Sequence, residues 1–135
     1  MKELSLSEMR RMQAQLHEKY RDSWRPQIPE NGHYNLLWMV EELGEAISVI
    51  KKFGDDAVMN DGTLRKAFIS ELCDIWMFME DVMTCYGVTP EEFSAVYAEK
   101  HAHNMSRDYD KNCEQIYEEY QDKFTKGEDA HAPES

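Results

Sequence analysis

The sequence has few cysteines and no long hydrophobic run. Its three cysteines, Cys73, Cys85 and Cys113, form no CxxC pair, a pattern that fits a reducing, intracellular compartment. Cys73 and Cys85 fall in an apolar helical pattern, where we expect both to be buried. No apolar stretch approaches the roughly 20 residues that span a bilayer, and residues 1–5 lack the apolar run of a signal peptide. We therefore expect a soluble, cytoplasmic protein that binds no membrane.

Basic residues are also scarce. The 135 residues include 15 Lys and Arg against 27 Asp and Glu, for a formal net charge of -12. This balance disfavours binding to nucleic acids or to anionic lipids. It is compatible with a small anionic ligand, provided that metal ions or local cations meet that ligand. The length suits one domain with a hydrophobic core.

Strand patterning is almost absent, and capping and breaking residues divide the chain into helices. The expected helices lie at about residues 5–24, 33–53, 63–86, 89–107 and 111–124. Residues 55–62 read as a polar turn. The predicted fold is all-α, a four-helix bundle core with an additional C-terminal helix, assembled as an oligomer. We expect one domain over residues 1–124 and a disordered acidic tail over residues 125–135.

The second and third helices each carry an apolar stripe with the helical period, which predicts two core faces. The stripe of the second helix comprises Leu36, Val40, Leu43, Ile47 and Ile50. The stripe of the third comprises Phe68, Leu72, Ile75, Trp76, Met79, Val82 and Met83.

Each of these helices also carries a pair of carboxylates at the same edge of its stripe. Glu-Leu-Gly-Glu ends at Glu45, and Glu-Leu-Cys-Asp ends at Asp74. The two acids of a pair are three residues apart and share a helix face. Antiparallel packing of the two helices would therefore bring Glu42, Glu45, Glu71 and Asp74 into one cluster. Like charges about 4 Å apart repel by on the order of 4 kcal/mol at an effective dielectric constant near 20, so we expect a cation between them.

The chemistry of the predicted ligands limits which metal ion can bind. Carboxylate oxygens suit Mg²⁺. Di-iron bundles use Glu-x-x-His pairs on helices, but the one such pair here, Glu30 and His33, falls in a loop rich in proline and glycine. An all-oxygen site therefore favours Mg²⁺ or Mn²⁺ over iron. The alternative is that the four acids are ordinary surface, or the acidic face of a non-catalytic helical module that binds a basic partner.

The spacing Glu41-Glu42-x-x-Glu45 followed by Glu71-x-x-Asp74 resembles the MazG-like all-α nucleoside triphosphate pyrophosphohydrolases. This superfamily includes dimeric dUTPases, a dCTP pyrophosphatase and phosphoribosyl-ATP pyrophosphohydrolase. The resemblance covers roughly residues 34–109. A later segment is similar to the family's Lys-x-x-x-Asn-x-x-Arg region and comprises Lys100, Asn104, Arg107 and Tyr109.

The resemblance implies a reaction, a ligand set and an assembly. Members bind Mg²⁺ through the four paired carboxylates and cleave nucleoside triphosphates between the α and β phosphates, which gives monophosphate and pyrophosphate. By this resemblance Glu41 orients or deprotonates the attacking water or contacts a further metal ion. Lys100 and Arg107 meet phosphate oxygens, and Asn104 bonds to phosphate or sugar. The substrates would be deoxynucleotides to be cleared from the pool, with phosphoribosyl-ATP as the alternative. The assembly would be a homodimer or homotetramer.

Three further residues are candidates for contact with the base. Trp38 lies four residues before Glu42, and Phe78 lies four residues after Asp74. Each aromatic ring therefore shares a face with the acids and can stack on a nucleobase. Core packing is the alternative for both. Asn35, one turn before Trp38, can read an edge of the base or the ribose.

Overall fold

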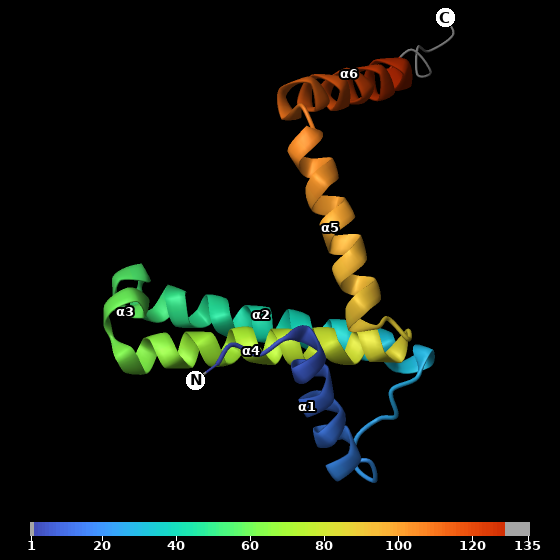
Figure 1. Ribbon diagram of the computed structural model, residues 1–135. Coiled ribbons are helices and arrows are strands. Elements are labelled where there is room, and N and C mark those ends of the chain that lie inside the picture. Colours follow the sequence, from blue (N-terminus) through green and yellow to red (C-terminus); the bar gives the residue numbers. More distant parts are fainter. Residues whose placement is uncertain (1, 129–135) are drawn as a thin grey trace, which may run out of the picture. The chain divides into compact units, whose positions relative to one another are not determined.

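A computed structural model describes residues 2–128 of the chain (Figure 1). These residues form six α-helices and a short 3₁₀-helix and contain no strand, which confirms the predicted all-α class. The elements are α1 Leu6–Lys19, η1 Pro29–Asn31, α2 Gly32–Phe53, α3 Asp55–Asn60, α4 Gly62–Cys85, α5 Pro90–Ser106 and α6 Tyr109–Glu128. Among the described residues, no helix combines the length and the apolar character needed to cross a membrane.

The helix starts follow local capping chemistry. The Ser5 hydroxyl accepts a hydrogen bond from the backbone N–H of Glu8 at 3.2 Å, and the Glu8 carboxylate accepts one from the Ser5 N–H at 2.8 Å. This reciprocal pair satisfies two N–H groups that have no partner within the helix. At the starts of α4 and α5 the side chains of Asp61 and Thr89 accept hydrogen bonds from backbone N–H groups of the first turn. Gly54 ends α2 with a φ of 84°, a conformation that glycine adopts without strain.

Two helix ends differ from the predicted ones by four residues or more. Helix α1 ends at Lys19 instead of Trp24, and the rings of Tyr20 and Trp24 stack with centroids 4.9 Å apart in the turn that follows. Pro26 disfavours the helical conformation only in Arg25, the residue before it, so it does not explain the end at Lys19. Helix α6 continues to Glu128, beyond the expected end at 124. The rest of the predicted tail lies outside the described residues.

The segment expected to be a turn between α2 and α4 instead contains the helix α3. Asp55 and Asp56 occupy its first turn, where negative side chains interact favourably with the helix dipole. Val58 is buried and anchors this short helix. The connection therefore adds packed surface to the end of the α2–α4 pair.

The chain divides into two compact units, Met1–Phe93 and Ser94–Ser135. In the first unit, α2 and α4 lie side by side and run antiparallel (Figure 1). Helix α1 packs against α4, and α3 contacts both long helices. The second unit holds α6 and all but the first turn of α5. The α2–α4 pair is therefore the centre of the first unit and sets the geometry of its side chains.

The apolar stripe of α2, which the sequence predicts to be core, is exposed in the single chain. Its five residues retain between 36% and 64% of their surface: Leu36, Val40, Leu43, Ile47 and Ile50. The face that packs on α4 is a neighbouring row. Asn35, Met39 and Ala46 are buried in this row, and Glu42 is half-buried. The helix is rotated relative to the prediction, so that Glu42 lies in the row that packs on α4, whereas Glu45 remains exposed.

The stripe of α4 agrees better with the prediction. Met83 is buried, and five others are half-buried: Phe68, Ile75, Trp76, Met79 and Val82. Leu72 and its neighbour Cys73 are exposed, so the expected burial of Cys73 is wrong, whereas Cys85 is buried as expected. The two cysteines are 12 positions apart in the chain, slightly more than three turns, which rotates them to different faces of α4.

Candidate metal site and adjoining cavity

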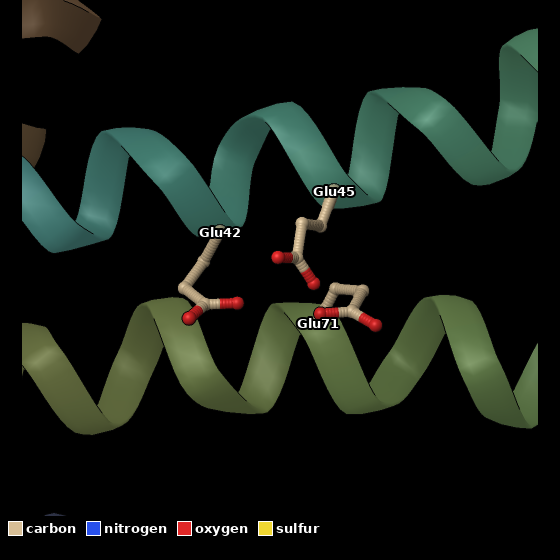
Figure 2. Close-up of side chains that lie close together, drawn as sticks. All are labelled: Glu42, Glu45 and Glu71. Atoms are coloured by element: carbon tan, nitrogen blue, oxygen red, sulfur yellow. The ribbon is translucent and has the colours of Figure 1, made fainter.

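Three carboxylates converge between the two long helices. Figure 2 shows Glu42 and Glu45 extending from α2 toward α4, which supplies Glu71. One oxygen of each residue lies within 4.8 Å of an oxygen of each of the others. Glu42 and Glu71 are half-buried, and Glu45 is exposed. The prediction that antiparallel packing brings the acidic pairs of α2 and α4 together is confirmed for these three residues.

The fourth predicted member, Asp74, adds negative charge to the same region. Partial burial, followed by the charges of Glu45 and Asp74, raises the pKa of Glu42 above its ordinary value. The same three causes, in the same order, raise the pKa of Glu71. Glu41 contributes the smallest increase to the pKa of Glu42. The site therefore disfavours its own full ionisation, as expected of acids that lie close together without a cation.

Within the first unit, no positive side chain contributes to the raised pKa values of Glu42 and Glu71. The ion pairs Arg10–Glu80, Arg21–Glu18 and Lys111–Asp108 lie elsewhere in the described part of the chain. The cluster thus offers several oxygen ligands and an uncompensated negative charge. Hard divalent cations such as Mg²⁺ and Mn²⁺ prefer such ligands. The residues present therefore fit the ion that the sequence predicts.

A cavity of about 570 Å³ adjoins the cluster. Glu41, Glu42 and Asp74 all line it. A ligand in this cavity would therefore lie against the carboxylates. Its volume falls within the range of about 300–1,000 Å³ that is typical of small-molecule sites.

Aromatic side chains form part of the wall of this cavity. Trp38 and Phe78, both candidates from the sequence, line it with their ring centroids 5.8 Å apart and their planes at 51°. Trp24, from the turn after α1, is a third aromatic lining residue. Trp24 could not be predicted to lie here, because its position depends on where α1 ends and how it packs on α4.

Asn35, the third candidate for contact with the base or the ribose, also lines the cavity. It is buried, and its amide nitrogen donates a weak hydrogen bond to the sulfur of Cys85 at 3.5 Å. The packing of Cys85 therefore holds this side chain in position.

A buried aspartate that sequence reasoning missed lies on the same cavity. Asp81 retains 4% of its surface and lines the cavity together with Gln13 and His17 of α1. Its Oδ1 accepts hydrogen bonds from the side-chain amides of Gln13 and Gln27, each at 3.0 Å. The adjacent acids Glu80 and Asp81, near the C-terminal end of the apolar helix α4, were the signal in the sequence. Burial of a carboxylate without partners is costly, and α1 with the segment that follows it provides those partners.

The remaining candidates belong to the second unit. Lys100 and Asn104 lie on α5, and Arg107 follows its last residue. The backbone N–H of Arg107 donates to the carbonyl of Asn104 at 3.3 Å, and the guanidinium lies 5.2 Å from the centre of the Tyr109 ring. Lys100 is exposed and Asn104 half-buried. Their contact with phosphate stays a prediction.

Comparison with known proteins finds no match: no family model, no curated protein and no solved structure is significantly similar to the chain. The resemblance to MazG-like enzymes therefore depends on the motif residues themselves.

Proposed function

We propose that the protein is a Mg²⁺-dependent nucleoside triphosphate pyrophosphohydrolase of the MazG-like type. It would hydrolyse deoxynucleoside triphosphates between the α and β phosphates to monophosphate and pyrophosphate, in clearance of the nucleotide pool. One observation carries this proposal: carboxylates from two facing helices converge without a counter-charge from the first unit, beside a cavity with aromatic walls. A triphosphate needs a cation at one end and a place for its base at the other, and these two features adjoin here.

Each group has a defined task in this proposal. Glu42, Glu45, Glu71 and Asp74 hold the metal. When bound, the ion lowers the pKa of a coordinated water and neutralises charge on the phosphates. Glu41, on the cavity wall, orients the attacking water and accepts its proton as the anhydride P–O bond breaks.

The cationic residues would bind the phosphate groups of the substrate. Lys100 and Arg107 bind phosphate oxygens, and Asn104 donates to phosphate or sugar. Phosphoryl transfer depends mainly on such positioning and neutralisation of charge. The net charge of -12 makes local cations necessary for an anionic substrate.

We further propose that the protein is a homodimer or homotetramer in which a second copy covers the exposed stripe of α2. Full burial of a valine, leucine or isoleucine side chain contributes about 1.5–3 kcal/mol. The stripe has five such residues on one helix face, a large apolar surface for an isolated chain. Packing of two α2–α4 pairs through these stripes would also complete the predicted four-helix bundle.

The direct test is a panel of ribo- and deoxynucleoside triphosphates, with phosphoribosyl-ATP as a further substrate, assayed with Mg²⁺ for pyrophosphate and orthophosphate separately. We expect pyrophosphate, and loss of both turnover and metal binding in Glu45→Gln and Asp74→Asn. Glu118→Gln, an exposed substitution on α6, is the matched control. Release of orthophosphate, or no turnover of any triphosphate, would contradict the proposal. Metal binding that survives both site variants would favour a regulatory module with an acidic face.

A further inference from the structure

The last helix, α6, carries an apolar stripe that the proposed metal site does not use. At about 100° of rotation per residue, the following side chains fall within an arc of roughly 100°: Tyr109, Cys113, Ile116, Tyr117, Tyr120 and Phe124. The aromatic residues and the isoleucine retain between 41% and 69% of their surface, and Cys113 is exposed as well. An amphipathic helix normally packs such a stripe against another element, but within the second unit this face of α6 is open.

The helix that carries the stripe is acidic. Over residues 109–125 it has five acids against two lysines, namely Asp110, Glu114, Glu118, Glu119 and Asp122 against Lys111 and Lys123. Lys111 already lies 4.0 Å from the carboxylate of Asp108. Glu114 flanks the stripe on one side and Glu119 on the other, each about a third of a turn from its middle. Both edges of the apolar surface therefore carry negative charge.

These charges decide what can cover the stripe. A second copy of α6 would bring the same acidic edges, and like charges that face each other destabilise a helix pair. The formal net charge of -12 adds to the repulsion between copies. A helix with basic residues on both sides of its apolar face would instead form ion pairs along both edges. Charge complementarity therefore favours a basic partner over a second copy of this helix.

The rings of the stripe also suit a partner that is both basic and apolar. The face of an aromatic ring attracts lysine and arginine side chains. At one end of the stripe, the guanidinium of Arg107 lies 5.2 Å from the centre of the Tyr109 ring. Toward the other end, Tyr117, Tyr120 and Phe124 line a cavity on the helix surface, where an apolar side chain can insert.

We propose that the stripe of α6 is a docking surface for a basic amphipathic helix of a partner protein. The apolar residues of that helix, spaced i, i+3, i+4 and i+7, cover the rings, and its lysines or arginines pair with Glu114 and Glu119. One helix face of this length buries less than the roughly 800 Å² per partner of a standard interface, so we expect a micromolar Kd. The surface includes none of the proposed metal ligands, so this inference does not depend on the proposed function.

The first test uses a synthetic partner of defined chemistry. The probe is a fluorescently labelled peptide of about 18 residues, five turns of helix, in which leucine and lysine follow the helical period. The control peptide has glutamate in place of lysine. Fluorescence anisotropy with the full-length protein measures both affinities. We expect the leucine–lysine peptide to bind about tenfold or more tightly than the control. Equal binding of the two peptides, or no binding of either, would overturn the proposal.

Two charge reversals on α6 separate the stripe from the general acidity of the chain. Glu119→Lys lies beside the stripe, whereas Glu118→Lys lies on the opposite face of the same helix and changes the net charge equally. We expect Glu119→Lys to weaken binding of the leucine–lysine peptide by about threefold more than Glu118→Lys does. Removal of two rings, in Tyr120→Ala combined with Phe124→Ala, should weaken binding by about tenfold or more. Equal weakening by the two charge reversals would overturn the proposal.

The native cysteines locate the bound peptide without any substitution. Cys113 lies in the stripe, and Cys73, which is exposed on α4, is the internal reference. Maleimide modification followed by mass spectrometry measures the modification rate of each thiol. At a peptide concentration ten times the Kd, we expect the rate at Cys113 to fall about tenfold and the rate at Cys73 to stay unchanged. An unchanged rate at Cys113 would place the peptide elsewhere. Protection of Cys113 in the free protein would show that the chain itself or a second copy covers the stripe. Either result would overturn the proposal.

Discussion

Trp38 on α2 and Phe78 on α4 lie with their ring centroids 5.8 Å apart, and each is one helical turn from an acid of the cluster. Trp38 precedes Glu42 by four residues, and Phe78 follows Asp74 by four. Because i and i+4 share a helix face, a single antiparallel register brings together both the rings and the carboxylates. The aromatic wall and the candidate metal site are thus two consequences of one helix pairing.

This pairing predicts that Trp38 contributes to binding more than to chemistry. Stacking of a base on an aromatic ring is worth about 1–3 kcal/mol in other proteins. In Trp38→Leu we expect KM for the preferred triphosphate to rise by about tenfold, with kcat changed much less. Steady-state kinetics would measure both constants. Trp76→Leu is the control, because Trp76 does not line this cavity. A fall in kcat alone would argue against a stacking role.

Metal binding should be visible as thermal stabilisation. A ligand that binds only the folded state at 100 times its Kd stabilises that state by about 2.7 kcal/mol. We expect Mn²⁺ or Mg²⁺ to raise the melting temperature of the wild type and to have little effect on Glu71→Gln. Differential scanning fluorimetry over a metal titration would check this. An equal rise in both proteins would place the ion elsewhere.

The raised pKa values of Glu42 and Glu71 predict how the metal-free protein responds to pH. The folded state retains protons on these groups above the ordinary pKa of 4.5, where the unfolded chain has already lost them. Stability must therefore fall as pH rises through the window between 4.5 and the raised values. We expect Glu42→Gln, which cannot ionise, to become more stable relative to wild type as the pH increases. Urea unfolding in EDTA at pH 5 and pH 7.5 would measure the difference. If the difference in the free energy of unfolding between Glu42→Gln and wild type did not change with pH, the prediction would be contradicted.

The sequence predicted the acidic cluster but not the surroundings that complete the site. The pairs were recognisable because Glu42 and Glu71 occupy equivalent positions in two repeated patterns on neighbouring helices. Asp81 has no repeated partner, and its role depends on Gln13, which is 68 residues away in the chain. Such long-range contacts depend on how α1 packs, which helical periodicity does not determine.

The orientation of α2 illustrates the same limit. Periodicity located its apolar stripe correctly, but a pattern cannot distinguish a face covered by the same chain from one left for a partner. The half-buried Glu42 and the buried Asn35 lie in the row that packs on α4, although a hydrophobicity rule would place both outside. Polar residues in an interface are typical of a functional site.

If a second copy covers this stripe, one charge should prevent assembly. Val40 and Ile47 are 64% and 61% exposed. We expect Ile47→Lys to shift the protein from an oligomer to a monomer, because the buried ammonium would lose its hydration. Light scattering after size-exclusion chromatography would measure the mass. Met59→Lys on α3, 65% exposed and off the stripe, is the control. A wild type that is already monomeric would contradict the proposed assembly.

The last prediction concerns the ion pair that fixes α1 to α4. Glu80 retains 2% of its surface and is paired with Arg10, whose Nη1 also donates to the carbonyl of Val88 at 2.8 Å. Arg10→Ala would leave the Glu80 carboxylate buried and unpaired, which destabilises a protein by about 3–5 kcal/mol. Urea unfolding would measure this loss.

The control for this ion pair is Arg21→Ala. The side chains of Arg21 and its partner Glu18 are 69% and 72% exposed, and such pairs contribute about 1 kcal/mol or less. Arg10→Met combined with Glu80→Leu should recover much of the lost stability, because no buried charge remains without a partner. If Arg10→Ala were no more destabilising than Arg21→Ala, α1 would be held by its apolar contacts. In that case, the position of Gln13 beside Asp81 would not depend on the ion pair.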